Sequence, residues 1–288
     1  MESFENRKLH TKHSAGAVIL TILKYLVLLI GCALVILPII VILFGAFKDN
    51  REFSNSGIFE LPKQLRWENF TTAFIDGNVL IGLKNTAIIL VISCAGSVIT
   101  GTMTAFVIQR FNSVLTKTVK AAFLVATLLP NISMQVTVFQ IVNKLGLYNT
   151  MAAPIILYVG TDIISIYIFI QFLNQISVSL DESGIVDGAS YPRIYFSIIL
   201  PNLTPAIATV LIIKFVSIYN DFYTPQLYMT DTKLSVVSTA LYNFVGPFGA
   251  KWEIIFAGII IAIIPTLIIF LTLQKYIYSG LVSGAVKE

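Results

Sequence analysis

Charged residues are scarce in this sequence. Only 12% of the 288 residues are Asp, Glu, Lys or Arg, whereas 56% are hydrophobic. A soluble globular domain carries about 25% charged residues, so this chain has too few to cover a surface that faces water. The formal net charge of +4 is small and forms no basic patch, which argues against nucleic acid as a partner. Membrane lipid is therefore the expected solvent for much of its surface.

Cysteine and histidine are also rare. Cys32 and Cys94 both lie in apolar stretches, where a small buried hydrophobic side chain is the expected role, in place of a disulfide or a metal ligand. His10 and His13 lie in a polar N-terminal tail, and two histidines without further ligands make a poor metal site. The sequence predicts no metal site and no cofactor bound by this chain.

Long apolar stretches are what the chain has in abundance. A helix needs about 20 apolar residues to cross a hydrocarbon core of roughly 30 Å. Backbone groups in lipid must be paired internally, and the stretches are too long and too uniformly apolar for barrel strands, so they are predicted to be helices. The stretches cover residues 18–47, 82–107, 120–142, 154–173, 204–229 and 253–278. The predicted fold is an all-α integral membrane protein with about six transmembrane helices in a single domain, residues 1–288.

The orientation of the chain follows from its ends and loops. The first stretch is much longer than the roughly 7–15-residue core of a signal peptide, so we interpret it as a retained helix. Six spans place both termini on one side of the membrane. That side carries slightly more Lys and Arg, and residues 110–120 contain no acid, so the positive-inside rule predicts cytoplasmic termini.

Small residues and prolines mark the predicted helices. Ser93, Ser97, Gly101 and Ala105 recur every four residues and share one helix face. Small residues let helix backbones approach closely in lipid, so this face packs either within the chain or against a partner subunit. Prolines in later stretches are predicted to bend their helices. They are Pro130, Pro225 and Pro265.

Residues 174–203, between the fourth and fifth stretches, form the most informative loop. Ser179 or Asp181 is a candidate helix cap, and Gly188 indicates a break or a close backbone approach. Pro192 suits the first turn of a second short helix. The loop is thus predicted to be a helix–glycine–helix element, folded either onto its own helix ends or against another protein. Its apolar positions need a cover: Ile185, Val186, Ala189, Tyr195, Ile198 and Ile199.

The same loop contains Glu182, then Asp187-Gly188-Ala189, Tyr195 and Leu200-Pro201, followed by Pro205. At these spacings it resembles the EAA loop of binding-protein-dependent ABC sugar importer permeases. That pattern runs E-A-A, two residues, D-G-A, an aromatic residue and L-P. The loop departs from it at Ser183 and Gly184, where the family usually has two alanines. Both replacements are small, although Gly184 is expected to weaken the helix by about 1 kcal/mol relative to Ala.

Three further stretches resemble the same family. Residues 219–225 are similar to its fifth-helix W-N-D-F-x-x-P pattern, with Tyr219 in place of Trp. Residues 274–287 resemble its closing Q-R-Y, G-L and G-A-V-K signature, and residues 46–48 with 67–70 match the pattern that follows the first helix. The resemblance covers nearly the whole chain, and it points to the smaller of the two permeases in maltose-type oligosaccharide importers.

This resemblance implies a function and a set of partners. Two permeases pair in the cytoplasmic membrane of a bacterium or archaeon, two ABC ATPase subunits dock from the cytoplasm, and an extracellular binding protein delivers the sugar. The chain lacks a Gly-x-x-x-x-Gly-Lys-Ser/Thr phosphate loop, so ATP and Mg²⁺ are expected in the partner ATPases and the chain is not expected to be an enzyme by itself.

In this family the EAA loop, residues 174–203 here, couples the permease to the ATPase. The resemblance implies that Glu182 contacts the ATPase or orders its own loop, and that Gly188 allows a sharp turn. It also implies that Ala189 and Tyr195 line the docking face. The candidate coupling residues are Glu182, Asp187, Gly188, Ala189, Tyr195, Leu200 and Pro201.

Two polar residues in the fifth stretch are candidates for the translocation path. A charge near the bilayer centre costs about 2.5–3.5 kcal/mol, so such residues usually face a cavity or a partner. Asn220 and Asp221 are expected either to line the path or to form a structural hydrogen bond between helices. Lys214 shares roughly their face and is expected to pair through a neighbour, while Asp162 is placed at the membrane interface.

The outer loop, residues 230–252, is rich in aromatic residues. Aromatic rings stack on sugars and also pack at membrane interfaces, so both roles remain open. By resemblance, this loop reaches into the binding protein. Its candidate docking residues are Tyr242, Phe244 and Phe248.

Three alternatives to a sugar importer permease are consistent with a membrane protein of this composition. A secondary transporter would carry its own ion-coupling site and often an inverted repeat, and neither is clear here. A channel or a purely structural membrane subunit has no obvious use for the helix–glycine–helix loop. A polyamine or amino-acid ABC permease is disfavoured by the sugar-type motifs and by the low charge of the spans. The particular sugar is left open.

Overall fold

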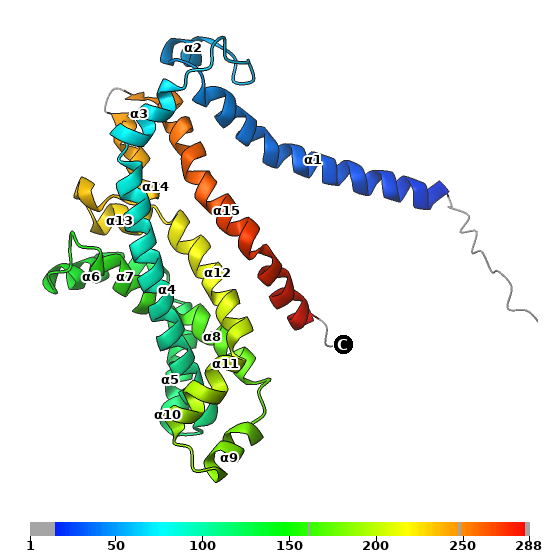
Figure 1. Ribbon diagram of the computed structural model, residues 1–288, viewed down its shortest axis with the longest axis vertical. Helices are drawn as coiled ribbons and strands as arrows, with labels where there is room; N and C mark the ends of the chain where they lie inside the picture. Colours follow the sequence, from blue (N-terminus) through cyan, green and yellow to red (C-terminus); the bar gives the residue numbers. More distant parts are fainter. Residues whose placement is uncertain (1–14, 161, 247–248, 286–288) are drawn as a thin grey trace, which may run out of the picture.

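The computed structural model describes residues 15–160, 162–246 and 249–285. The chain folds into an elongated helical bundle in which α4 runs along the long axis (Figure 1). The longer helices are α1 (Ala15–Ala46), α3 (Glu68–Asp76), α4 (Val79–Arg110), α5 (Val114–Thr127), α6 (Asn131–Lys144), α7 (Ala152–Gly160), α8 (Ile163–Leu173), α9 (Ser179–Val186), α12 (Thr204–Asn220) and α15 (Trp252–Ala285). The shorter elements are α2 (Asn50–Asn55), α10 (Tyr191–Ile194), a π-helical turn (Tyr195–Ile199), α11 (Leu200–Asn202), α13 (Tyr223–Tyr228), α14 (Val237–Ala240), two 3₁₀ turns (Thr232–Leu234 and Leu241–Phe244) and the hairpin β1 (Val245–Gly246) and β2 (Gly249–Ala250).

Four helical stretches in the described part of the chain are long and apolar enough to cross a membrane. They are Val18–Ala46, Val79–Arg110, Ala152–Leu173 and Trp252–Thr272. The number rises to six if each of two bent helix pairs forms one span. These six match the predicted stretches in order, and the predicted all-α membrane fold with about six spans is confirmed.

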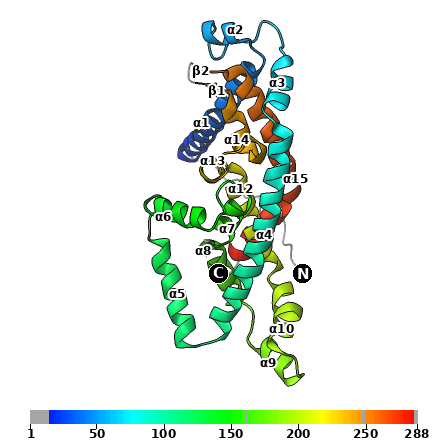
Figure 2. The same ribbon diagram turned by 90° about the vertical axis from the view of Figure 1, so that its left-hand side faces the viewer.

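The third predicted span is not straight. α5 and α6 are bent by 113° relative to each other, and Figure 2 shows them as an angled arm at the left of the view. Pro130 lies in the break in an extended conformation, with φ −65° and ψ 119°, directly before α6. Proline has no N–H to donate and cannot continue a helix without a clash. The bend predicted at Pro130 is confirmed, but a single helix over residues 120–142 is wrong.

The fifth predicted span also ends early. α12 ends at Asn220, and Asp221 leaves the helical conformation with φ −71° and ψ 112°. Its Oδ1 accepts a hydrogen bond from the N–H of Thr224 (3.0 Å), in the first turn of α13. Pro225 therefore lies in this separate short helix, and the prediction that it bends the fifth span is wrong.

The row of small residues on α4 packs within the chain. Ser93, Ser97, Gly101 and Ala105 are all buried. A Cβ atom added to Gly101 would lie 3.0 Å from the ring of Phe169 on α8, so the two helices approach closely at this point. The intramolecular alternative is confirmed.

The main core lies where α4 and α8 meet α10 to α12. It ties the helix–glycine–helix element to the transmembrane helices. Its buried members are Ala105, Phe106, Phe169, Ile170, Leu173, Ile194, Tyr195, Ile199, Leu203, Ala206 and Val210.

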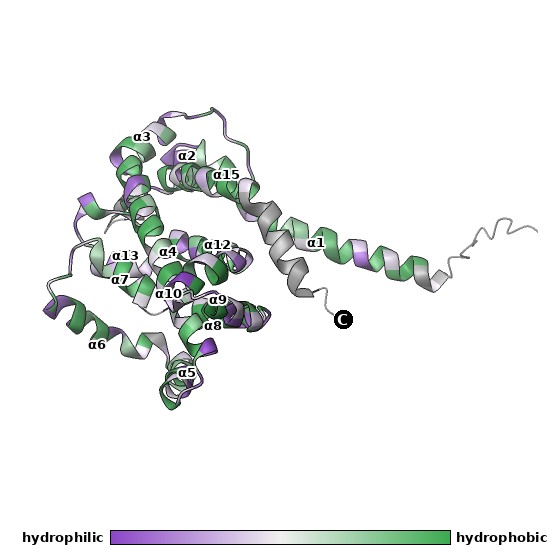
Figure 3. Cartoon of the chain, turned by 60° about the horizontal axis from the view of Figure 1, so that its bottom comes forward, coloured by the Kyte–Doolittle hydropathy of each residue, from purple (hydrophilic) through white to green (hydrophobic). Residues whose placement is uncertain are grey.

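α1 stands apart from this core. Figure 1 shows it projecting away from the bundle, and Figure 3 shows that its residues are predominantly hydrophobic. Its residues 18–40 are exposed, and near its last turn Gly45 contacts the ring of Phe256 on α15. The interpretation of Cys32 as buried is wrong because it lies on this exposed helix, whereas Cys94 on α4 is buried as expected.

Candidate coupling and translocation sites

The predicted helix–glycine–helix arrangement is present in residues 174–203, which we call the coupling segment. α9 ends with a hydrogen bond from the N–H of Gly188 to the carbonyl of Ile185 (3.0 Å). A second runs from the N–H of Ala189 to the carbonyl of Gly184 (2.9 Å). Gly188 has φ +77°, so the two bonds form a Schellman cap, in which other residues would adopt the left-handed conformation at a cost of about 1–2 kcal/mol. Gly188 thus sets the turn between α9 and α10.

Asp181 does not cap α9. The N-terminus of α9 has no side-chain cap, and Asp181 instead forms an ion pair with Arg110, the last residue of α4. Arg110 Nε lies 2.6 Å from Asp181 Oδ2, and their side chains are only 7% and 10% exposed. Arg110 Nη2 also donates to the carbonyl of Ile176 (3.1 Å). Because a buried charge is costly without its partner, this pair fixes the start of α9 to the end of α4.

Tyr195 lies in the core of the molecule. Its hydroxyl is 2.7 Å from that of Thr102, its ring centroid is 5.6 Å from that of Phe106, and its residue exposure is 5%. The expectation that Tyr195 lines the docking face is therefore wrong, because α4 covers it. Its contacts position the coupling segment on α4. Of the remaining candidates here, Leu200 is half-buried and Pro201 is exposed.

Gly184, one of the two departures from the family pattern, has a packing role. It is buried in α9, and a Cβ atom added there would lie 3.1 Å from Ile194 Cγ1 and 3.2 Å from Ile198 Cδ1. The glycine lets α9 lie directly against α10 and the π-helical turn. The loss of helix propensity relative to Ala, about 1 kcal/mol, is offset by this close contact.

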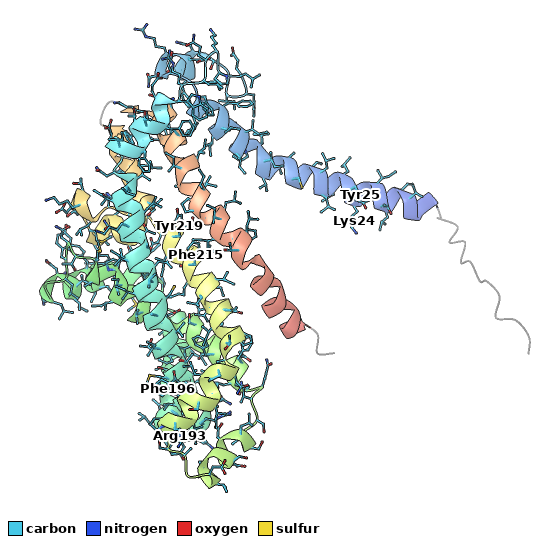
Figure 4. The ribbon with its side chains drawn as sticks, in the orientation of Figure 1. Lys24, Tyr25, Arg193, Phe196, Phe215 and Tyr219 are labelled. Carbon is cyan, nitrogen blue, oxygen red and sulfur yellow. The ribbon has the colours of Figure 1, made fainter. Side chains whose placement is uncertain are left out.

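One face of the coupling segment remains uncovered within the chain. Glu182 and Asp187 are exposed, and Ala189 is half-buried. Figure 4 places Arg193 and Phe196 at the same end of the molecule. Exposed apolar side chains of the coupling segment include Val186 (86%), Phe196 (61%), Tyr191 (52%) and Ile185 (48%). We call this set, with Glu182 and Asp187, the coupling face.

Asn220 opens onto a cavity. Its side chain is exposed and its amide donates to the carbonyl of Val216 (2.9 Å). With Tyr219 and Ser238 it lines a cavity of about 500 Å³ between α12, α14 and α15. Tyr219, labelled with its stacked neighbour Phe215 in Figure 4, also donates to a carbonyl of α15 (2.7 Å). The residue that replaces the family Trp therefore holds α12 against α15.

Asp221 points to a different environment. Its Oδ2 accepts a hydrogen bond from the hydroxyl of Tyr158 (2.9 Å), and its backbone carbonyl accepts one from Ser238 (2.7 Å). Together with the bond to Thr224, these contacts connect α7, α13 and α14. The structure separates the two candidate path residues, since Asn220 faces the cavity and Asp221 braces helices.

Lys214 pairs with Asp162. Lys214 Nζ lies 3.1 Å from Asp162 Oδ2, with both side chains about 10% exposed, and it also donates to the carbonyl of Tyr158. Asp162 Oδ1 accepts from the N–H of Ser165 (3.3 Å) at the start of α8. The predicted link from Lys214 to Asp221 through a neighbour is present in Tyr158, whose carbonyl accepts from Lys214 and whose hydroxyl donates to Asp221. The Asp162 side chain lies between the start of α8 and α12, and its placement at the membrane interface stays a prediction.

The aromatic candidates of the outer loop have different surroundings. Tyr242 is 51% exposed, with its ring centroid 5.5 Å from that of Phe222. Phe244 is half-buried against the cluster that joins α1, α3 and α15. Phe248 lies outside the described residues. Of the three, Tyr242 offers a described surface for docking.

No group of three or more metal-ligating side chains is found among the residues that the structure describes. The candidate sites consist of hydrogen bonds, ion pairs and apolar contacts. Their arrangement joins helices and leaves several side chains of the coupling segment exposed.

Comparison with known proteins decides the family. The family described as "Binding-protein-dependent transport system inner membrane component" matches residues 97–282, which contain the whole coupling segment together with Lys214 and Asp221. The chain belongs to this family. This permease is therefore a membrane component of a binding-protein-dependent ABC transport system, as its EAA-like loop indicated.

Individual relatives extend over nearly the full length of this permease. It is 30% identical to the probable starch degradation products transport system permease protein AmyC of Thermoanaerobacterium thermosulfurigenes, over 92% of this chain and 97% of the relative. It is 29% identical to the trehalose/maltose transport system permease protein MalG of Thermococcus litoralis, over 92% and 98%. It is also 29% identical to the melibiose/raffinose/stachyose import permease protein MelC of Bacillus subtilis, over 92% and 96%.

A solved structure shares the fold of this permease. A chain of a bacterial ABC transporter that imports the acidic polysaccharide alginate superposes with a TM-score of 0.81 at 19% identity. The match covers 91% of this permease and 98% of that chain. The ABC importer permease fold is thereby confirmed.

Proposed function

We propose that this permease forms part of the membrane path of an ABC importer for a carbohydrate, and that the carbohydrate is an oligosaccharide. It pairs with a second permease, and two ATPase subunits bind ATP and Mg²⁺ and dock on the coupling face. An extracellular binding protein delivers the sugar. In this arrangement both termini and the coupling segment are cytoplasmic, and the chain itself catalyses no reaction.

The coupling face is the observation that carries this proposal. The coupling segment exposes apolar side chains such as Val186 and Phe196 together with the acids Glu182 and Asp187. The segment beneath them is rigid, because the Gly188 cap, the Arg110–Asp181 pair and the buried Tyr195 all hold it to α4. A rigid apolar surface with a charged rim fits a protein partner.

A carbohydrate is supported as the substrate class by two observations. The relatives named above transport starch degradation products, trehalose or maltose, and melibiose, raffinose or stachyose. The cavity beside Asn220 has a mainly aliphatic lining that also contains one amide, the hydroxyls of Ser238 and Thr266 and two aromatic rings, without a charged group. Such a surface suits a neutral ligand rich in hydroxyl groups.

The test is reconstitution of the complex in detergent with its second permease and ATPase, followed by ATP hydrolysis with and without binding protein and sugar. We expect Gly188→Val to reduce the stimulated rate at least tenfold, because Val in the left-handed turn displaces α10. Gly146→Val is the matched control. Gly146 has φ +69° and closes the same type of cap after α6, far from the coupling face.

Two results would overturn the proposal. If the wild-type chain binds no ATPase, the importer assignment fails. If Gly188→Val and Gly146→Val reduce stimulated hydrolysis equally, the loss reflects general backbone strain, and the coupling role of residues 174–203 fails.

A further inference from the structure

The loop that follows α13 is hydrogen-bonded to α4 near the N-terminal end of this helix, and we call this set of contacts the outer clasp. The side-chain amide of Asn85 donates to two backbone carbonyls of that loop, those of Lys233 and Ser235, each at 2.9 Å. Asn85 is only 3% exposed. A buried amide that satisfies two carbonyls in one loop holds that loop in a fixed place.

Two neighbours on the same face complete this outer clasp. The hydroxyl of Thr86 accepts a hydrogen bond from the N–H of Val237 (3.0 Å). A Cβ atom added to Gly82 would lie 3.1 Å from the backbone of Val236, so only a glycine lets the loop approach this closely. Gly82, Asn85 and Thr86 are three and four residues apart and share one helix face.

A second set of contacts, which we call the inner clasp, lies at the C-terminal end of the same helix. Thr102, Phe106 and Arg110 recur every four residues and face the coupling segment. Thr102 and Phe106 hold Tyr195, and Arg110 holds Asp181. All five side chains are mostly buried, so the coupling segment cannot move without moving this end of α4.

α4 connects the two clasps without a break. It is one continuous α-helix of 32 residues with no proline, from Val79 to Arg110. At 1.5 Å per residue, Asn85 and Arg110 are roughly 38 Å apart along its axis. Figures 1 and 2 both show α4 extending from the level of α3 and α14 to that of α5 and α10. By contrast, α5 and α6 are separated by a 113° bend, and α12 ends at Asn220.

We propose that α4 is the element that transmits movement between the coupling segment and residues 231–240 of the outer loop. Asn85 is then a positioning residue for ATP hydrolysis stimulated by the binding protein, although it lies at the end remote from the coupling face. This inference rests on the proposed function, since it assigns a route to the coupling that the function requires. It predicts that a change at Asn85 alters the response to the binding protein and not basal hydrolysis.

The variant Asn85→Asp tests this directly. Aspartate has nearly the same shape as asparagine but cannot donate to the carbonyls of Lys233 and Ser235, and its charge repels them. In the reconstituted complex we expect basal ATP hydrolysis within about twofold of wild type and a loss of at least fivefold in stimulation by binding protein with sugar. Asn143→Asp, at an exposed position on α6, is the matched control and should leave both rates unchanged.

A double variant separates a series connection from two independent defects. We expect Asp181→Asn to reduce stimulation by weakening the inner clasp. If α4 connects the clasps in series, Asn85→Asp combined with Asp181→Asn should be no worse than the stronger single variant. If the two fold-losses multiply, the clasps act independently and the proposal is overturned.

The remaining outcomes are also decisive. If wild type is stimulated and Asn85→Asp retains that stimulation, the inference fails while the proposed function stands. If wild type shows no stimulation at all, the proposed function itself fails. Should Asn85→Asp not assemble, Thr86→Val removes the acceptor for Val237 at nearly constant volume, and the same results confirm or overturn the inference.

Discussion

Lys214 and Asp162 show how a pair of charges is accommodated inside a membrane helix bundle. Each side chain is about 10% exposed, and they are 52 positions apart in the chain. The fifth-span cation was recognisable from sequence as needing a partner, because an isolated charge in lipid is costly. Its partner was not, because hydropathy places Asp162 near a helix end, and only the packing of α8 on α12 brings the two together.

Removing one member of this pair should be worse than removing both. Lys214→Met leaves the Asp162 carboxylate buried without its cation and should destabilise the permease by about 3–5 kcal/mol. The double variant Lys214→Met with Asp162→Asn should recover most of this loss. Thermal unfolding of the detergent-solubilised complex measures both, and an equal loss in the single and double variants would show that the pair is not energetically coupled.

Asn220 and Asp221 are adjacent in sequence but should have different mutant effects. Asp221→Ala removes the acceptor for Tyr158 and for the N–H of Thr224, so it should lower stability by about 1–3 kcal/mol. Asn220→Ala removes a side chain exposed to the cavity, so it should leave stability within about 0.5 kcal/mol and change the KM for sugar uptake. Transport into proteoliposomes together with thermal unfolding separates the two, and the opposite pattern would reverse their assigned roles.

The pairing of Arg110 with Asp181 in the coupling segment was likewise not predictable from the sequence. Arg110 was visible only as a basic residue at the end of a span, and Asp181 as an acid in the first turn of a helix. Either could have been solvated at a membrane surface. A usable signal did exist, because residues 110–120 contain no acid to balance Arg110, but its partner is supplied by a loop about 70 positions later.

At the scale of elements, the coupling segment was the most predictable part of the chain. Gly188 and Pro192 are residues with narrow conformational roles, and both lie where those roles predict, at the C-cap of α9 and in the first turn of α10. Helix ends inside the membrane were less predictable. Hydropathy predicts a fifth span that continues to residue 229 because residues 222–229 contain no charge, whereas Asp221 ends α12 through its own hydrogen bonds.

The contact between α9 and α10 gives a prediction at this scale. Gly184→Ala places a Cβ atom tightly against Ile194 and Ile198 but restores helix propensity, so stability should change by less than about 1 kcal/mol. Gly184→Leu cannot fit and should separate α9 from α10, with loss of ATPase docking in co-purification. Ser183→Leu, on the exposed side of the same helix, is the control; loss of docking in both would indicate a surface effect instead.

At the scale of the whole molecule, the two cysteines differ in whether the rest of the chain buries them. Cys32 lies on the exposed α1 and Cys94 is buried on α4. Cys32→Trp should therefore change the stability of the isolated permease by less than about 0.5 kcal/mol, whereas Cys94→Trp should overpack its site and cost about 1–3 kcal/mol, as measured by thermal unfolding in detergent. An equal loss in the two variants would contradict the burial of Cys94 on α4.

The exposure of α1 has a consequence for the stability and the abundance of this permease in a cell. None of the apolar window of this 32-residue helix is buried against its own chain, so the second permease proposed above would supply the helix packing that α1 lacks. Part of the folding free energy is thus a binding free energy, and it varies with the concentration of the partner by mass action. A cell that makes this subunit in excess would contain unassembled permease with an incompletely packed α1. The amount of permease should therefore be limited by the least abundant partner subunit and by proteolysis of the unassembled chains.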